Sequence, residues 1–207
     1  MRRRRRGSGL RVGVLFVAAS VLAGACGSDP PRELAGYRRE PAPSVGELSL
    51  PDLSAAGDEF NLRADPGHLL VVYFGYTNCP DFCPTTLSDL KLATKRMKAA
   101  DAARIDVAMA TVDPERDLPI LPDYIASFFD EGHALGTDDE QRLAEVAAPF
   151  GVSYNISEAA DGSVEVSHTT SLYAIDDTGH LALTWQFGVS IDDLAADMTQ
   201  LLESSSV

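Results

Sequence analysis

Two apolar runs with a helical segment between them most constrain the fold of this chain. LVVYFGY (70–76) is rich in Val, Tyr and Phe, and IDVAMATVD (105–113) is almost as apolar. Such runs are expected of strands that are buried on both faces. Residues 84–100 between them repeat apolar side chains at helical spacing, from Leu87 to Met97. The order strand, helix, strand predicts a β-α-β unit.

The segments that follow predict a complete α/β domain. They are helices at about 122–128, 138–148 and 191–202, a strand at 133–136, and strands within 164–176 and 180–187. Thr137 and Glu140 form a capping-box pattern, and Ser190 is the expected cap of the last helix. Asp177-Thr178-Gly179 predicts the turn of an antiparallel hairpin. We therefore predict a thioredoxin-like α/β fold, with a central mixed sheet flanked by helices.

The N-terminus predicts export. Arginines at 2–6 and Arg11 precede VGVLFVAASVL, an apolar segment of the length of a signal-peptide core and too short for a comfortable membrane span. It ends in Ala23-Gly24-Ala25-Cys26, which resembles a bacterial lipobox, where the cysteine is acylated. We predict a lipoprotein signal peptide over 1–25 and a lipid anchor on Cys26, at the extracytoplasmic face of the cell membrane. Because Ala23 replaces the usual large aliphatic residue, cleavage by an ordinary signal peptidase is the alternative.

The exported part is strongly acidic. Residues 1–25 carry six of the 17 basic side chains and none of the 31 acidic ones, so 11 basic and 31 acidic side chains remain, a formal charge of −20. Such a surface repels nucleic acid and anionic lipid. Residues 26–46, rich in Pro, Gly and charge, predict a flexible tether, and residues 47–207 are long enough for one domain with a sizeable core.

A dithiol loop follows the first predicted strand. In GYTNCPDFCPTTL (75–87), Cys79 and Cys83 each precede a proline. Residues before proline avoid the α region, so we expect extended or turn conformations for both, with Pro84 opening the helix. The helix N-terminus would then favour thiolate at Cys83. A reversible disulfide is expected in an oxidising compartment. A purely structural disulfide is the alternative, although so small a loop gains little stability from one.

Two close thiols can also bind a soft metal ion, with an imidazole as third ligand. Of the four histidines, His68, His133 and His180 follow turn or loop residues and are expected to be solvated. His168 lies in VEVSHTTSLYA, where alternate residues form a mostly apolar strand face. The residues alone leave it open whether His168 is a ligand or a hydrogen-bonded core residue.

TVDPERD (111–117) contributes a carboxylate. Asp113 ends the second predicted strand, and parallel topology brings it to the same sheet edge as the thiols. It could act as a weak metal ligand, as a partner of a ligand or as a proton acceptor, in support of the redox thiols. Alternatively, Asp113 simply starts a turn before proline, and Arg116 pairs with a neighbouring acid.

YFGYTNCPDFCPTTLSDL, TVDPERD and VEVSHTTSLYAIDDTG, in this order, resemble the SCO/SenC family of copper-binding, thioredoxin-like proteins over about residues 45–204. The resemblance implies copper, as Cu(I) or Cu(II), on Cys79, Cys83 and His168, and a functional role for Asp113. It implies delivery of copper to the dinuclear centre of cytochrome c oxidase subunit II, or reduction of the cysteines of that centre. Asn78 departs from the histidine that many members carry.

Three classes of function compete at this point. The first is a metallochaperone, and the second is a thiol-disulfide oxidoreductase that cycles Cys79 and Cys83 without needing metal or His168. The third, a peroxidase or redox sensor, lacks its expected cysteine pattern. Copper donor and thiol reductant could be one mechanism, since thiols must be reduced before they take up copper.

Overall fold

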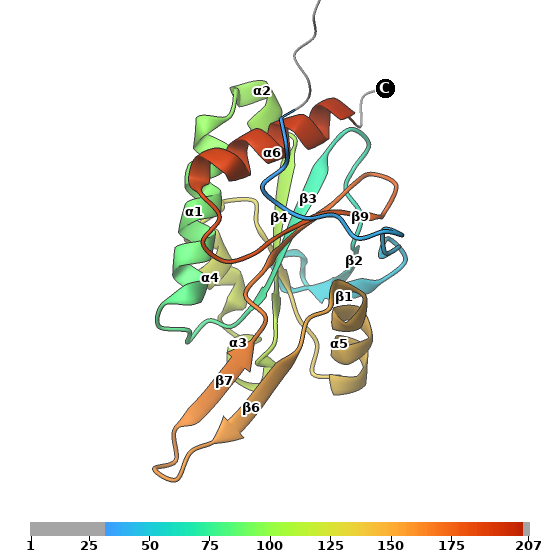
Figure 1. The fold of residues 1–207 in the computed structure, drawn as a ribbon. Coiled ribbons are helices and arrows are strands. Elements are labelled where there is room, and N and C mark those ends of the chain that lie inside the picture. Colours follow the sequence, from blue (N-terminus) through green and yellow to red (C-terminus); the bar gives the residue numbers. More distant parts are fainter. Residues whose placement is uncertain (1–31, 205–207) are drawn as a thin grey trace, which may run out of the picture. The chain divides into compact units, whose positions relative to one another are not determined.

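The computed structural model of the protein describes residues 32–204. Within them, a seven-stranded mixed sheet has the order β2-β1-β5-β4-β3-β8-β9, and β6 and β7 form a separate two-stranded sheet (Figure 1). The strands are β1 (Ser49–Asp52), β2 (Asp58–Asn61), β3 (Leu69–Gly75), β4 (Ile105–Thr111), β5 (His133–Leu135), β6 (Tyr154–Glu158), β7 (Val164–His168), β8 (Leu172–Ile175) and β9 (Leu181–Trp185). The α-helices are α1 (Phe82–Arg96), α2 (Ala99–Ala102), α3 (Pro114–Asp117), α4 (Leu121–Ala126), α5 (Glu140–Ala147) and α6 (Ile191–Ser204), with 3₁₀ turns η1 (Leu53–Ala55) and η2 (Ala148–Phe150).

The predicted β-α-β unit is confirmed. β3 pairs in parallel with β4 along its whole length, from Leu69 opposite Ile105 to Gly75 opposite Thr111. β5 extends the parallel part, while β8 pairs antiparallel with the other edge of β3 and β9 pairs antiparallel with β8. The thioredoxin-like α/β fold is therefore present, with the carboxyl ends of β3 and β4 side by side.

Alternation along β3 divides the core into two layers. Leu69, Val71 and Tyr73 face the layer covered by α1, α4 and α6. Their neighbours Leu70, Val72 and Phe74 face the layer that α5 covers. All seven residues of β3 are buried, as the apolar run predicted. Burial of each large apolar side chain contributes about 1.5–3 kcal/mol to the stability of the fold. Because β3 supplies such side chains to both layers, it stabilises both.

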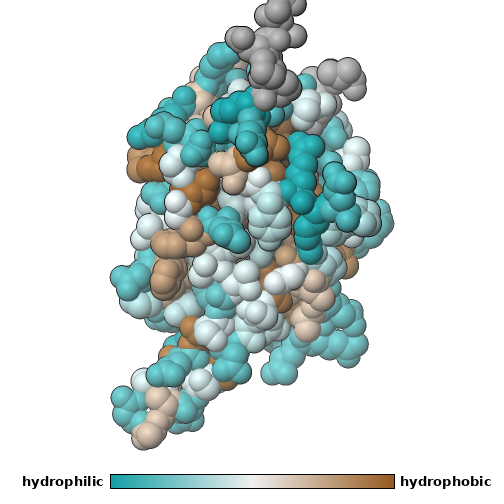
Figure 2. Space-filling view, viewed as in Figure 1, coloured by the Kyte–Doolittle hydropathy of each residue, from teal (hydrophilic) through white to brown (hydrophobic). Residues whose placement is uncertain are grey.

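The segment 164–176 is not one strand. β7 ends at His168 and pairs with β6, from Tyr154 opposite His168 to Glu158 opposite Val164, while β8 starts at Leu172 in the main sheet. β7 and β6 are mostly exposed and project from the domain, and Figure 2 shows mainly hydrophilic residues on this arm. In the sequence, the alternation of side chains continues through residues 169–171, between the end of β7 and the start of β8. Periodicity therefore could not reveal that the chain changes sheets.

The expected tether is wrong for residues 33–46, which belong to the domain. Tyr37 pairs with Thr184 of β9, and Val45 is fully buried. The backbone N–H groups of Ala35 and Gly36 donate to the carboxylate of Asp197 in α6, both at 3.0 Å. These hydrogen bonds satisfy the backbone of a segment that has no apolar period of its own.

Two helix starts also differ from expectation. Asp139, rather than Thr137, caps α5, because its side chain accepts from the Arg142 N–H. α1 begins at Phe82, two residues before Pro84. The Ser190 cap of α6 is confirmed by the Asp193 N–H, which donates to its hydroxyl. No helix between residues 32 and 204 is both long and apolar enough to cross a membrane; the predicted signal peptide and Cys26 lie outside the described residues.

Candidate metal centre

The thiol loop joins the carboxyl end of β3 to α1. Cys83 lies in the first turn of α1 and is fully buried, and its Sγ accepts a hydrogen bond from the Tyr73 hydroxyl at 3.4 Å. Cys79 is 8% exposed, and its Sγ accepts from the Cys83 backbone N–H at 3.4 Å. The expectation of a non-helical Cys83 is therefore wrong. Pro84 is tolerated because a proline in the first helical turn removes an N–H that has no partner within the helix.

Gly75, the last residue of β3, leaves the space that Cys83 needs. A Cβ at this position would lie 2.5 Å from the Tyr73 ring and 3.2 Å from Cys83 Sγ. The first distance is too short for any real side chain, so a larger residue would displace the ring that donates to the sulfur. The sequence places Gly75 just before the loop but does not reveal this close approach.

His168 reaches the thiols from β7. Its Nδ1 lies 2.9 Å from the Thr169 carbonyl oxygen, a contact in which Nδ1 must carry the proton, so Nε2 is left with its lone pair. Nε2 lies 3.6 Å from Cys83 Sγ. The rings of Tyr73 and Tyr76 meet the imidazole edge-on, with centroids 6.0 and 5.6 Å away. His168 is half-buried and faces the thiols, so the reading of it as a core residue apart from them is not supported.

Electrostatics distinguish the two thiols. Burial raises the pKa of Cys83 to about 12, so this thiol is protonated at neutral pH. Burial also acts on Cys79, but hydrogen bonds from the Cys83 backbone N–H and other neighbours outweigh it, and the pKa of Cys79 falls below its ordinary value. Burial lowers the pKa of His168, which keeps the imidazole neutral. Cys79 is thus the readier nucleophile and His168 a ready ligand.

The three ligand atoms form a set that suits a soft metal ion. Cys79 Sγ, Cys83 Sγ and His168 Nε2 or Nδ1 all lie within 4.8 Å of one another, the one such group of three among residues 32–204. Thiolate sulfur disfavours Mg²⁺ and Ca²⁺ and favours ions such as Cu(I) or Zn²⁺, while imidazole also suits Cu(II). Both thiols are free in the structure, so the disulfide between Cys79 and Cys83 stays a prediction.

The carboxylate that touches the thiol loop is Asp117 rather than Asp113. Asp113 is buried before α3 and accepts from Arg116 Nε at 2.6 Å, and it is not part of the ligand group. The alternative that Arg116 pairs with a neighbouring acid is therefore confirmed. Asp117, the last residue of α3, accepts from the N–H and hydroxyl of Thr77 in the loop. Both acids belong to TVDPERD, and the spacing alone does not indicate which one contacts the thiol loop.

The remaining histidines are separate from the thiols. His68 Nδ1 lies 3.0 Å from Asp106, and His133 Nδ1 lies 2.7 Å from Asp52. These two are paired with acids rather than simply solvated, which corrects our expectation. His180 lies 2.8 Å from the Thr178 hydroxyl in the β8–β9 turn. None of the three shares the ligand group of His168 within the described chain.

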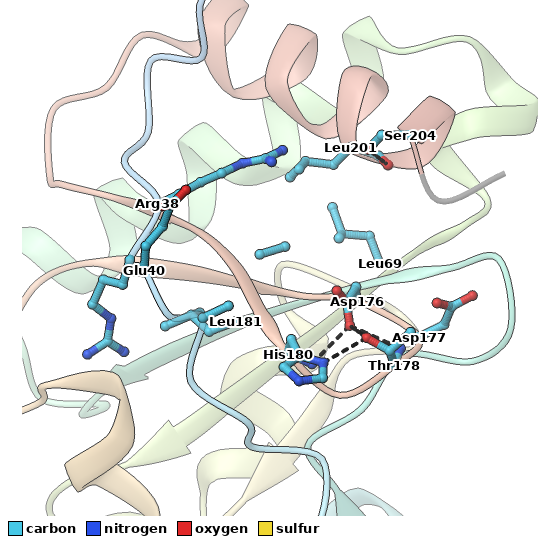
Figure 3. Close-up of a pocket in the computed structure, with 13 residues that line it drawn as sticks. Arg38, Glu40, Leu69, Asp176, Asp177, Thr178, His180, Leu181, Leu201 and Ser204 are labelled. Carbon is cyan, nitrogen blue, oxygen red and sulfur yellow. Dashed lines mark hydrogen bonds between the residues drawn. The ribbon is translucent and has the colours of Figure 1, made fainter. Parts of the chain in front are cut away.

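A large hollow lies at the other end of β3. It has a volume of about 620 Å³ and is lined by Arg38 and Glu40, the β8–β9 turn, the first residue of β3 and the end of α6 (Figure 3). The seven residues of β3 separate Leu69 in this hollow from the thiol loop, about 20 Å along a strand. The close-up shows His180 held in the turn: its backbone N–H donates to the Asp176 carboxylate, and its ring Nδ1 lies beside the Thr178 hydroxyl. No thiol lines the hollow, so size alone does not identify the reactive site.

Both the sequence and the fold of this chain are similar to those of known proteins. The SCO1/SenC family model matches residues 42–203. An SCO2-like protein of Rickettsia prowazekii is 31% identical over 191 residues, covering 88% of this chain and 87% of the relative. Apo Sco1 of Thermus thermophilus has a TM-score of 0.68 at 29% identity, over 82% of this chain and 97% of that one. Copper-bound ScoI of Bradyrhizobium japonicum has a TM-score of 0.63 at 28% identity, over 74% and 96%.

Proposed function

This chain belongs to the SCO1/SenC family, and on that premise we propose that it is an exported copper-binding protein that takes part in cytochrome c oxidase assembly. The single observation that carries the proposal is the meeting of Cys79 Sγ, Cys83 Sγ and a histidine nitrogen of His168 within 4.8 Å. A copper-bound relative of the same fold supports the choice of metal. Copper is the cargo, which the site receives and passes on.

The two thiols would do different work in binding. Metal-bound cysteine is deprotonated, so Cys83, whose pKa is raised to about 12, must release its proton when copper binds. The pKa of Cys79 is lowered, and this residue is 8% exposed whereas Cys83 is fully buried. We therefore assign Cys79 as the first contact for incoming copper and for the thiolate of a receiving protein, with Cys83 as the buried anchor. Transfer proceeds by ligand exchange without net oxidation.

The receiver that we propose is oxidase subunit II, at its dinuclear copper centre. The test is to titrate the reduced chain lacking residues 1–26 with Cu(I) and Cu(II), then to offer the loaded protein to apo subunit II and follow the copper. We expect one copper per chain and its transfer to the receiver. Loading without transfer would overturn delivery, and absence of loading would overturn copper binding.

A thiol reductant is the second candidate, favoured by the unequal thiols. The Cys79 thiolate would attack a disulfide of the receiver and release one thiol. Cys83 would then attack Cys79 Sγ, lose its proton and release the second thiol, leaving a Cys79–Cys83 disulfide and two electrons on the receiver. This route does not need His168. Undiminished receiver reduction by His168→Ala, together with absent copper binding by the wild type, would favour it.

We further propose that the mature protein is held at the membrane through acylated Cys26. The lipobox-like sequence before Cys26 supports this, and residues 1–31 lie outside the described structure. Cys26→Ala should leave the precursor unprocessed at that site and prevent incorporation of labelled fatty acid. Equal labelling of mutant and wild type would show that the anchor is elsewhere.

A further inference from the structure

Asp117 is a buried acid that neither the motif nor the ligand set explains. Its side chain is fully buried at the end of α3. Three donors converge on it: Thr77 N–H at 2.9 Å, the Thr77 hydroxyl at 2.5 Å and the Thr111 hydroxyl at 2.6 Å. A buried carboxylate is destabilising unless it is well hydrogen-bonded, whereas an apolar residue could pack at this position without such partners. The presence of Asp117 therefore indicates that its polar contacts have a role.

The contact joins the thiol loop to the end of the parallel strand pair. Thr111 is the last residue of β4, and Thr77 lies two residues before Cys79. Asp117 therefore ties the start of the loop to both α3 and β4. The residue before Thr77 is Tyr76, whose ring contacts His168 and whose hydroxyl lies 3.5 Å from the Val166 carbonyl in β7. Movement at Thr77 would thus affect Cys79 on one side and the contact with the histidine strand on the other.

We propose that Asp117 is the positioning residue of the metal centre: through Thr77 it fixes the loop so that Cys79 faces Cys83 and His168. Asp113 has no such contact, because its carboxylate is taken up by Arg116. The proposal deepens the copper-binding function proposed above and rests on it for its metal readout. A second readout, the reactivity of Cys79 in the metal-free protein, does not depend on copper.

The structure offers a matched control for Asp117. Asp197 in α6 is equally buried and also accepts hydrogen bonds from the N–H groups of Ala35 and Gly36 and from Trp185 Nε1 at 2.8 Å. These partners lie outside the thiol loop. Asp117→Ala and Asp197→Ala should therefore both lower the melting temperature of the mature chain, while only the first should alter the metal centre.

The expected results differ in kind between the two variants. Asp117→Ala should weaken Cu(II) binding roughly 10- to 100-fold, the effect typical of residues that orient metal ligands, and shift the thiolate-to-copper absorption. In the reduced, metal-free protein it should also change the alkylation rate of Cys79. Asp197→Ala should keep the wild-type spectrum, affinity and alkylation rate. If Asp117→Ala matches Asp197→Ala in these three measurements, Asp117 is only a stabilising residue and the proposal is wrong.

Conservative variants protect the test against a variant that fails to fold. Asp117→Asn keeps an oxygen that can accept from the Thr77 N–H and the Thr111 hydroxyl, while its amide can donate to Thr77 Oγ1. It should therefore retain the wild-type spectrum, as should Thr77→Ser, whereas Thr77→Val should shift it. An Asp117→Asn spectrum as altered as that of Asp117→Ala would overturn positioning by hydrogen bonds. Wild type that binds no copper would overturn the function, while Cys79 alkylation would still decide the role of Asp117.

Discussion

Cys83 lies among fully buried side chains of the main sheet and α1, whereas His168 ends a strand whose other residues are exposed or only partly buried. One ligand therefore belongs to the core, and the other comes from a two-stranded sheet outside it. Packed cores tolerate little displacement, while small exposed sheets contribute little stability. The difference indicates that packing of the core is enough to position Cys83. A bound metal would add a link between the core and the β6–β7 arm.

The largest effect is expected from breaking the core side. Cys83→Ala removes the buried sulfur, so binding of both Cu(I) and Cu(II) should be lost, and the Tyr73 hydroxyl loses its acceptor. Loss of this buried hydrogen bond should cost about 0.5–1.5 kcal/mol of unfolding free energy. Metal titration and denaturant unfolding of the metal-free protein measure both losses. Cys79→Ala is the control, because it should lose metal with a smaller loss of stability; equal losses would contradict a core role specific to Cys83.

Breaking the other side should separate metal binding from stability. His168→Ala keeps both sulfurs, so Cu(I) should bind more weakly, whereas Cu(II), which prefers nitrogen and oxygen donors, should be lost together with its charge-transfer absorption. The Nδ1 contact is a single hydrogen bond to the carbonyl of the next residue, so we expect a stability loss of about 1 kcal/mol or less. A destabilised variant with an unchanged Cu(II) spectrum would remove His168 from the site.

The two thiols should also differ from each other in reactivity. In the reduced, metal-free protein Cys79 should be alkylated well before Cys83, because it is 8% exposed against 0% for Cys83 and its pKa is lowered, while the pKa of Cys83 is raised to about 12. As the pH is raised, the alkylation rate of Cys79 should level off before that of Cys83, because the pKa of Cys79 is lowered and that of Cys83 is raised. Mass spectrometry after timed alkylation assigns each site. Equal rates for both thiols at neutral pH would contradict the asymmetry.

The smallest effect is expected at the surface beside the thiols. Phe82, between the two cysteines, is 48% exposed and its ring meets that of Phe187 with centroids 4.8 Å apart. Exposed aromatic residues are often anchors for partners. Phe82→Ala should leave copper affinity unchanged but weaken the contact with the receiving protein by about 1 kcal/mol, seen as slower copper transfer. Ile120→Ala, exposed to a similar extent and outside the thiol loop, is the control; equal slowing by both would argue against a local contact.

Much of the site could be predicted from local sequence, but the roles of Asp113 and Asp117 could not. The thiol loop, the parallel strands and the position of Asp113 at the sheet edge followed from apolar runs and from topology. The choice between Asp113 and Asp117 did not, because it depends on which way α3 turns its side chains. Asp113 meets Arg116 and Asp117 meets Thr77. A similar limit applied to Gly75, whose importance comes from the Tyr73 ring and Cys83 Sγ nearby.

The sequence by itself indicated the central elements, since an apolar run of strand length rich in β-branched and aromatic residues favours a buried strand, and a dithiol directly after it lies at that strand's end. It also indicated that the site could hold a soft metal ion, because two thiols close together limit the metals that can bind. Only the tertiary structure decided that residues 33–46 join the domain, that the chain changes sheets after His168 and that this histidine faces the thiols. These outcomes depend on contacts between residues distant in sequence, and neither periodicity nor local propensity contains that information.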